Sequence, residues 1–350
     1  MDNSEKIILG ISIGDYNGIG IEIILKTFSD KRMFDFCTPV IFASAKLISA
    51  YKKFIDFDIQ INGIKRVENA IDGKLNVLNL WNEEFEINPG EISKEAGAYA
   101  FKSLEAATNA LLVNEIGVLI TAPINKDNIQ SENFKFPGHT EYLESKIDGE
   151  SLMILMSENL KIGLITGHIP VSKIASEVTS ALIKKKVEIL HKTLIRDFAI
   201  TKPKIAVLGL NPHCGDNGVI GSEDDEIIRP TLAEIQQEGK LIYGPYAADS
   251  FFGSGNYKNF DAILAMYHDQ GLAPFKTLSF GEGVNYTAGL DKIRTSPDHG
   301  TAYEIAGKNK ANINSFKEAV FTALKVYKTR TEYKSLIENT LKISVQKEDH

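Results

Sequence analysis

Three histidines follow apolar, strand-like segments, and each opens a turn that contains glycine or proline. His168 ends the segment KIGLITGH, His213 ends KIAVLGLNPH, and His268 ends DAILAMYH. In layered α/β proteins, ligands bind beyond the carboxyl ends of the strands, where the loops converge. Three neutral imidazoles gathered there, with a position left to water or substrate, would form an open catalytic metal site. Each histidine alone could simply be a polar residue capping a strand, but the repeated pattern favours metal or substrate chemistry.

Two other segments carry groups that suit a small acidic ligand. The segment FPGHTEY places His139 and Thr140 in a loop before a short helix, where the threonine could also serve only as an amino-terminal cap. Further on, Lys276, Asn285 and Arg294 lie in glycine-rich surroundings rather than on an evident amphipathic helix. Lysine and arginine both bind phosphate, and arginine also binds carboxylate through two parallel hydrogen bonds. The alternative is a set of solvated loop charges.

The turn Gly14–Gly20, GDYNGIG, joins a predicted strand to a predicted helix. Its glycines let the backbone approach a ligand, and a helix amino terminus favours an anion. A dinucleotide fingerprint of the Rossmann type would also need an acidic residue about 20 positions later. The sequence there reads Phe42-Ala43-Ser44, so this fingerprint is absent. The glycines are as typical of a tight turn without a ligand as of a binding turn.

The composition is that of an ordinary globular protein. The 350 residues are 43% apolar and 24% charged, enough for one large domain or two moderate ones. The formal net charge of −7 argues against nucleic acid as the main partner. The start, MDNSEK, predicts no signal peptide, and no apolar run is long enough to span a bilayer. We therefore expect a cytoplasmic protein without a membrane partner.

The two cysteines, Cys37 and Cys214, lie far apart and lack metal-ligand spacing. This usage fits free thiols in a reducing compartment better than a disulfide framework. Cys214 follows His213 directly, so a nucleophilic cysteine–histidine pair is an alternative interpretation. Neighbours at a turn rarely point at each other, which disfavours that pair.

Strand-like and helix-like segments alternate along the chain, which indicates an α/β layered fold with a largely parallel sheet. The near-continuous apolar strands suit a sheet covered on both faces. The predicted strands are Ile7–Ile13, Pro39–Ala43, Leu75–Leu78, Gly117–Thr121, Leu152–Ser157, Lys161–Thr166, Lys204–Leu210, Lys240–Tyr243 and Asp261–Met266. The predicted helices are Ile21–Thr27, Ala45–Phe54, Lys94–Leu112, Ser180–Phe198, Asp225–Gln237 and Asn314–Lys328.

No repeat, low-complexity tract or proline-rich linker divides the chain, so any subdomains must share one compact body. We expect two α/β subdomains that meet at a cleft. The first comprises residues 1–125 and 290–350, and the second, residues 126–289, carries most metal and substrate ligands. The charged tail Glu332–His350 is expected to fray.

Six short motifs are spread along the chain: TAPINK at Thr121–Lys126, PGHTE at Pro137–Glu141, TGH ending at His168, LNPHCGDNG at Leu210–Gly218, MYHDQG at Met266–Gly271 and IRTSPDHGTA at Ile293–Ala302. With them, nearly the whole chain resembles the 4-hydroxythreonine-4-phosphate dehydrogenase family of vitamin B6 (pyridoxal phosphate) biosynthesis. The first turn departs from the family's GDPAGIGPE, because Tyr16, Asn17 and Ile21 replace Pro, Ala and Pro. Its glycines and Glu22 are retained, but the rigidity that proline would give is lost.

This resemblance implies one divalent metal per subunit, held by His168, His213 and His268. Zinc, cobalt, manganese or magnesium are the candidate ions. It also implies a homodimer with shared active sites and a phosphorylated amino-acid substrate. The implied substrate contacts are His139, Thr140, Lys276, Asn285 and Arg294.

A second likeness concerns the segment DHGTA at Asp298–Ala302, followed by IAGK at Ile305–Lys308. It is similar to the loop of isocitrate and isopropylmalate dehydrogenases that holds the adenosine half of NAD. The likeness implies a fold of that type and binding of NAD or NADP without a Rossmann fingerprint. The implied cofactor residues are His299, Gly300, Thr301 and Asn312.

The implied reaction is NAD-dependent oxidation of 4-phosphohydroxy-L-threonine to a 3-keto acid, which loses carbon dioxide to give 3-amino-2-oxopropyl phosphate. The metal would lower the pKa of the alcohol and polarise the ketone. Lys276 is expected to assist proton movement or balance the phosphate charge. Asp269 and Asp249 are candidates to orient a metal-bound histidine or water, although Asp269 could equally cap a strand end.

Other functions remain open at this point. Relatives of the family act on dihydrodiols or phosphorylated sugar acids, so 4-phosphoerythronate or 4-phosphothreonate could be the substrate. A phosphate acyltransferase of similar fold would need a phosphate cleft without metal, and the three histidines argue against it. A non-catalytic binding module is the weakest alternative, because many ionisable groups converge at strand ends.

Overall fold

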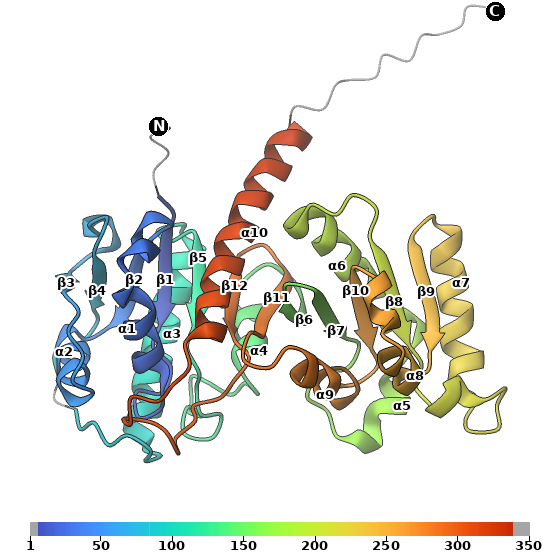
Figure 1. Ribbon diagram of the computed structural model, residues 1–350, viewed down its shortest axis with the longest axis horizontal. Helices are drawn as coiled ribbons and strands as arrows, with labels where there is room; N and C mark the ends of the chain where they lie inside the picture. The colour runs from blue at the N-terminus through green and yellow to red at the C-terminus, as the bar shows by residue number, and fades with distance from the viewer. Residues whose placement is uncertain (1–5, 84, 339–350) are drawn as a thin grey trace, which may run out of the picture.

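The computed structural model describes residues 6–83 and 85–338, which form one mixed sheet with helices on both faces (Figure 1). The strands are β1 (Ile8–Ser12), β2 (Thr38–Ala43), β3 (Ile61–Ile64), β4 (Leu75–Asn79), β5 (Val118–Thr121), β6 (Gly149–Ser157), β7 (Leu160–Leu164), β8 (Lys204–Leu208), β9 (Leu241–Tyr246), β10 (Ala262–Ala265), β11 (Val284–Leu290) and β12 (Arg294–Pro297). The helices are α1 (Gly20–Ser29), α2 (Ala45–Phe54), α3 (Lys94–Leu112), α4 (His139–Glu144), α5 (Ile174–Glu177), α6 (Ser180–Phe198), α7 (Arg229–Gln237), α8 (Ala248–Gly253), α9 (His268–Leu278) and α10 (Asn314–Glu338).

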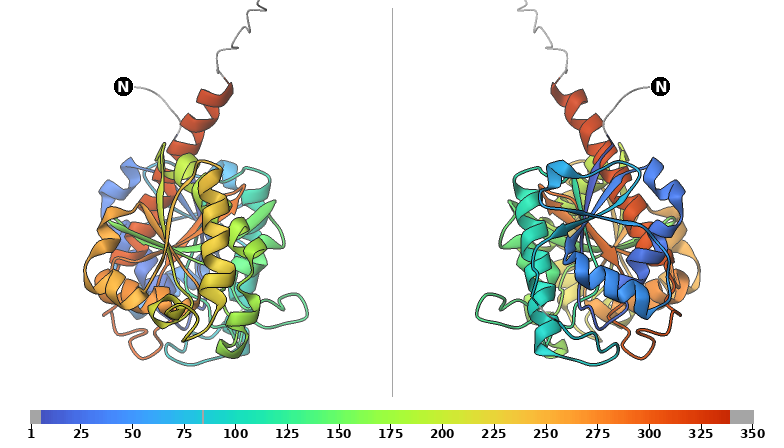
Figure 2. Two further views of the ribbon diagram at one scale, coloured as in Figure 1. Left: turned by 90° about the vertical axis from the view of Figure 1, so that its right-hand side faces the viewer. Right: turned by 90° about the vertical axis from the view of Figure 1, so that its left-hand side faces the viewer.

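The twelve strands follow the order β3-β4-β2-β1-β5-β12-β11-β6-β7-β10-β8-β9 across the sheet. Neighbours are parallel except at three central pairs, β12–β11, β11–β6 and β6–β7. Seen end-on, the strands fan around the long axis of the molecule (Figure 2), so the sheet is strongly twisted. The predicted α/β fold with a largely parallel sheet is confirmed.

Burial explains why the strands form this sheet. All residues of β2, β5 and β10 are buried, as expected of strands with helices packed on both faces. Helices α3 and α6 begin where hydroxyl side chains cap them: Ser93 accepts a hydrogen bond from the Ala96 amide, and Thr179 accepts one from the Leu182 amide. No helix in the described part of the chain is both long and apolar enough to cross a membrane.

Several sequence expectations were wrong in detail. Lys276 lies on α9, Asn285 on β11 and Arg294 on β12, not in loops. Helix α9 was missed because Gly271 and Pro274 interrupt its helical pattern. Strand β12 was missed because it is short and polar, although every residue in it is buried. His268 is accordingly the first residue of a helix, not part of a turn.

Two further boundaries differ from expectation. His139 begins α4, so the PGHTE segment contributes its histidine and threonine from a helix rather than from the loop before it. Helix α10 continues ten residues past the expected end, from Lys328 to Glu338, so residues 332–338 are helical rather than frayed. The remainder of the expected tail, residues 339–350, lies outside the described residues.

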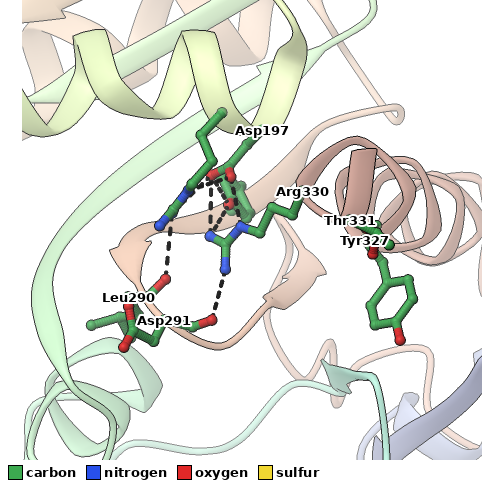
Figure 3. Close-up of polar contacts among 8 residues, drawn as sticks. Asp197, Leu290, Asp291, Tyr327, Arg330 and Thr331 are labelled. Atoms are coloured by element: carbon green, nitrogen blue, oxygen red, sulfur yellow. Dashed lines mark hydrogen bonds and ion pairs between the residues drawn. The ribbon is translucent and has the colours of Figure 1, made fainter. Parts of the chain in front are cut away.

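A buried ion cluster connects α6, β11 and α10 (Figure 3). The fully buried Asp197 carboxylate accepts hydrogen bonds from Arg330 Nε at 2.6 Å, Arg196 Nε at 2.8 Å and the Tyr286 hydroxyl at 2.5 Å. Arg330 also donates from Nη1 to the carbonyl oxygen of Asp291 at 2.9 Å. These contacts attach the final helix to the centre of the sheet.

Candidate active site

A cavity of about 270 Å³ lies over the central strands. Every residue expected to contact substrate lines it, and so do two of the three histidines expected to bind metal. The lining residues of interest are Thr121, Lys126, His139, Thr140, Glu141, His168, His268, Lys276, Asn285, Arg294, Asp298, His299 and Gly300. Thr121, Lys126, Glu141 and Asp298 had not been assigned a role from sequence, although each lies in a motif quoted above.

His168 and His268 follow neighbouring parallel strands, β7 and β10, and their ring centroids lie 5.3 Å apart. Each ring has a carboxylate beside its Nδ1 atom. Glu141 Oε1 lies 3.5 Å from Nδ1 of His168, and Asp269 Oδ1 lies 2.6 Å from Nδ1 of His268. The hydrogen bond to His168 also lowers the pKa of Glu141. A carboxylate at Nδ1 is the usual partner of a metal-binding imidazole, and it leaves Nε2 for the ion.

His213 is separated from this pair. It follows β8, the strand beside β10, but lies in a short 3₁₀ helix, Pro212–Gly215, with a left-handed backbone (φ 54°). The Asp224 carboxylate holds the preceding turn by accepting hydrogen bonds from the amides of Leu210 and Asn211, each at 2.9 Å. The His213 side chain is exposed and does not line the cavity. Among residues 6–83 and 85–338 no three side chains are grouped to hold a metal ion.

The residues present therefore fit a divalent ion in part. Two imidazoles with oriented Nε2 atoms are in place, and a third protein ligand is lacking within the described chain. An open catalytic site uses about three protein ligands plus water or substrate. A metal site of that kind would need a further protein ligand at the cavity.

Arg294 provides a buried positive charge in the cavity wall, since it is only 2% exposed. Its Nε and Nη2 atoms donate to Thr121 Oγ1 at 3.0 and 2.6 Å, and Nη1 donates to Thr287 Oγ1 at 3.1 Å. Burial lowers the pKa of Arg294 to about 9, so the guanidinium remains charged at neutral pH. Both partners are neutral hydroxyls, and a buried cation without a carboxylate partner favours an anionic ligand.

Two buried polar atoms beside Arg294 have no hydrogen-bond partner. They are Nε2 of His139 and Oδ1 of Asn285. Burial, together with the nearby charges of Arg294 and Lys126, holds the pKa of His139 well below its ordinary value. The imidazole is therefore neutral at physiological pH, and its free nitrogen can bond to a ligand. Buried groups of this kind are normally paired, so they mark the place of a polar ligand.

Two lysines add positive charge to the same cavity. Lys276 reaches it from α9, and Lys126 reaches it from the segment after β5. Neither ammonium group forms an ion pair with any described residue. With Arg294, they supply three cationic groups around a small volume, which suits a substrate with more than one negative charge.

The expected cofactor residues lie on one irregular segment after β12. His299 and Gly300 line the cavity, and the buried Nε2 of His299 has no partner. Thr301 and Asn312 lie further along, outside the cavity: the Thr301 carbonyl accepts from the Ile19 amide, and the Asn312 side chain accepts from the Asn314 amide. An unpaired donor or acceptor at the rim of the cavity fits a polar cofactor there.

The remaining candidates lie away from the cavity. Asp249 is on α8 and does not line it. The Cys214 thiol is 5% exposed and does not line it either, and burial, followed by the Asp224 charge, raises its pKa. A thiol that is neither ionised nor at the cavity does not suit a nucleophile, so the structure offers no support for a Cys214–His213 pair.

Several known proteins are similar to this chain over most of its length. The family model described as pyridoxal phosphate biosynthetic protein PdxA matches residues 35–323. The chain is 48% identical over 339 residues to a 4-hydroxythreonine-4-phosphate dehydrogenase of Bacteroides thetaiotaomicron, covering 96% of this chain and 93% of the relative. It is 41% identical to the enzyme of the same name from a Sulfurihydrogenibium species, covering 92% and 99%. A crystal structure of that enzyme from Klebsiella pneumoniae superposes with a TM-score of 0.77 at 31% identity, covering 94% and 100%.

Proposed function

The chain belongs to the PdxA family of pyridoxal phosphate biosynthetic proteins, and from that premise we propose that it oxidises 4-phosphohydroxy-L-threonine with NAD and a divalent metal. It is an oxidoreductase, as its relatives named 4-hydroxythreonine-4-phosphate dehydrogenase are. The observation that carries the proposal is the buried Arg294 guanidinium beside the unpaired atoms of His139 and Asn285. Such a cluster favours an anionic, hydrogen-bonding ligand.

The charges of the cavity match the two ends of this substrate. A phosphate monoester carries about −1.5 to −2 charges at neutral pH, and the substrate also has a carboxylate. Arg294, Lys276 and Asn285 would bind the phosphate, while His139 and Thr140 would contact the other end of the substrate or the rim of the phosphate. The unpaired Lys126 is available to the carboxylate.

The chemistry places different demands on the residues at the metal end. His168 and His268 would hold the ion, with Glu141 and Asp269 fixing the ring orientations. The ion would lower the pKa of the substrate hydroxyl and polarise the ketone, and NAD would take the hydride. Lys276 would assist proton movement or balance the phosphate charge. The keto acid then loses carbon dioxide, and the carbon that held the carboxylate takes up a proton, which gives 3-amino-2-oxopropyl phosphate.

We also propose that the protein is a homodimer in which His213 of each chain reaches the partner's cavity. His213 is exposed and lies outside the cavity of its own chain. Two apolar side chains near these histidines are strongly exposed. Val171, after His168, is 82% exposed, and Val219, after His213, is 80% exposed. Apolar surface at such positions suits burial against a second copy.

Within each chain we propose the subdomain division expected from sequence, residues 1–125 with 290–350 and residues 126–289. The sheet order supports it, because the strands of the first set and those of the second set meet only at β12–β11.

Two free cysteines, both buried, are consistent with the proposed cytoplasmic location.

The decisive experiment measures the rate of NADH formation, by absorbance, with each of several candidate substrates. Purified enzyme with a divalent metal should show its highest kcat/KM with 4-phosphohydroxy-L-threonine, above 4-phosphoerythronate and 4-phosphothreonate. Metal analysis should give about one ion per chain. A higher kcat/KM with either sugar acid would reassign the substrate, and acyl-phosphate synthesis by metal-free protein would contradict the proposed reaction class.

A further inference from the structure

The turn between β1 and α1 lies beneath the segment that carries His299, not in the substrate cavity. None of its residues lines that cavity. The Ile19 amide donates to the Thr301 carbonyl at 3.0 Å, and a Cβ atom at Gly18 would lie only 2.8 Å from the same oxygen. Glycine is therefore required at position 18 for contact between two backbones. This turn supports another part of the protein rather than a ligand of its own.

The segment from His299 to Asn312 needs such support, because it has no regular secondary structure of its own. Three of its residues, Ala302, Gly307 and Asn309, have left-handed backbone angles of φ 46°, 72° and 56°. A segment of this kind has no strand or helix ladder to fix its shape. Its conformation depends on contacts with the elements below it.

Asp15 provides the first of these contacts. Its fully buried side chain accepts from the Tyr303 hydroxyl at 2.8 Å and from Asn128 Nδ2 at 2.6 Å through Oδ2, and from the Asn17 amide at 2.9 Å through Oδ1. Burial, followed by the adjacent Asp15 carboxylate, raises the pKa of Tyr303, so this hydroxyl remains a donor. The bond joins the first turn of the chain to a residue 288 positions later.

Glu22 and Lys26, in the first and second turns of α1, provide the second contact. The buried Glu22 carboxylate accepts from the Ala311 amide at 2.8 Å. Lys26 Nζ donates to Glu22 at 2.8 Å and to the carbonyl oxygens of Asn309 and Ala311 at 3.0 and 3.3 Å. The segment is thus held near its start at Tyr303 and near its end at Ala311.

We propose that Asp15, acting through Tyr303, and Glu22, acting through Ala311, are positioning residues that hold segment 299–312 in the shape that receives the nicotinamide cofactor. This inference rests on the proposed function. Neither carboxylate reaches the cavity, so each acts only through the segment. A segment that is already ordered loses less conformational freedom when the cofactor binds, and its affinity for the cofactor is higher for that reason. The chemical step, which uses the residues around Arg294, does not depend on these contacts.

The test compares two substitutions that each remove one hydroxyl. Tyr303→Phe removes the bond to Asp15. Tyr16→Phe is the matched control: its hydroxyl belongs to the same turn but donates to Glu95, on α3, at 3.3 Å. Calorimetric titration of the metal-loaded protein with NAD should show a Kd raised about tenfold in Tyr303→Phe and changed less than about twofold in Tyr16→Phe. The KM for NAD should follow the Kd, while kcat at saturating NAD and the KM for the phosphorylated substrate stay within about twofold of wild type.

Hydrogen exchange of the protein without cofactor gives an independent readout. Amides of residues 300–312 should exchange faster in Tyr303→Phe than in Tyr16→Phe or wild type. Equal NAD affinity in the two variants would overturn the positioning role even if wild-type enzyme oxidises its substrate with NAD. Wild-type protein that binds no NAD would overturn both this inference and the proposed function, and that failure would be visible before any substitution is made.

Discussion

His168 and His268 lie with ring centroids 5.3 Å apart, and Nδ1 of each ring faces a carboxylate. Residues 100 positions apart in the chain are brought together because β7 and β10 are adjacent parallel strands. The two carboxylates differ in environment: the Glu141 side chain is 34% exposed, whereas that of Asp269 is 86% exposed. Because of this difference in exposure, we expect the two carboxylates to contribute unequally to metal affinity.

Glu141→Gln should weaken metal binding about 10- to 100-fold, because the amide cannot balance the charge that His168 acquires when it binds an ion. Asp269→Asn, which alters a well-solvated carboxylate, should weaken binding less. Competition with a chromogenic chelator measures both affinities without relying on turnover. Equal metal affinity in wild type and Glu141→Gln would show that this carboxylate does not orient His168.

Mixing two inactive variants tests the shared metal site. His168→Ala and His213→Ala should each abolish activity as separate proteins. If each site combines His168 of one chain with His213 of the other, mixed dimers contain one intact site. Unfolding and refolding an equal mixture should then recover about a quarter of wild-type activity, since half of the dimers are mixed. No recovery would place both histidines in the site of one chain, and a fully active monomer in sedimentation would exclude the dimer.

Arg294→Lys should raise the KM for the phosphorylated substrate about 10- to 100-fold, with a smaller effect on an unphosphorylated analogue. A lysine cannot replace the three guanidinium N–H groups with which Arg294 donates to Thr121 and Thr287. Arg229→Lys, in an exposed pair with Asp225, is the control and should leave both KM values unchanged. Equal losses on both compounds would assign Arg294 to the carboxylate or to a structural role.

His139 predicts a pH dependence of stability. Its pKa is lowered in the folded protein by burial, so between that pKa and the ordinary value near 6.5 the unfolded chain binds a proton that the folded chain does not. Stability should therefore fall as pH decreases below about 6.5. In His139→Gln the loss of stability that comes from protonation of His139 in the unfolded chain should be absent. Urea unfolding from pH 7.5 to 5 measures it, and identical slopes in the two proteins would contradict the assignment.

Asp197→Asn should destabilise the fold by about 3–5 kcal/mol, because it leaves two arginines without their shared carboxylate. Burial by itself would raise the pKa of Asp197, but Arg330 and Arg196 outweigh it and lower that pKa. The stabilisation is thus complete above the unfolded pKa of about 3.9 and is lost as pH falls through the lower folded value. Asp225→Asn, in the exposed pair with Arg229, should cost about 0.5 kcal/mol or less. Chemical denaturation near pH 7 compares the two, and similar losses would contradict the prediction.

Periodicity predicted the longer helices α1, α2, α3, α6, α7 and α10, but not α9. The ends of α2, α3 and α6 coincide with the predicted residues, because each has a continuous apolar face and a polar residue before it. Strand β11 was missed although VNYTAGL alternates apolar residues with polar residues and glycine. Strand β12 could not be predicted, since RTSP is polar and becomes buried only through its central place in the sheet.

The sequence predicted which residues form the site, but not how close their side chains lie to one another. Motifs identified the residues that line the cavity, including Arg294 and His139. Strand-end positions could not show that His213 lies further past its strand than His168 or His268, because loop conformation decides this. The contact of Glu141 with His168 could not be predicted either, since it depends on how α4 packs against β6. The Asp15–Tyr303 bond joins opposite ends of the chain and has no local sequence pattern.

The two strands at the middle of the sheet, β11 and β12, are the last strands that the ribosome makes. While the chain is being synthesised, β5 has an open edge on the side that β12 will occupy, and β6 has one where β11 will pair. Open strand edges are templates for wrong pairing, and contacts this distant in sequence form slowly. A nascent chain stalled before residue 284 would hold two partial sheets that no strand pairing joins. Union of the sheet is therefore a late event, and chaperones would be needed most during synthesis of the residues before β11.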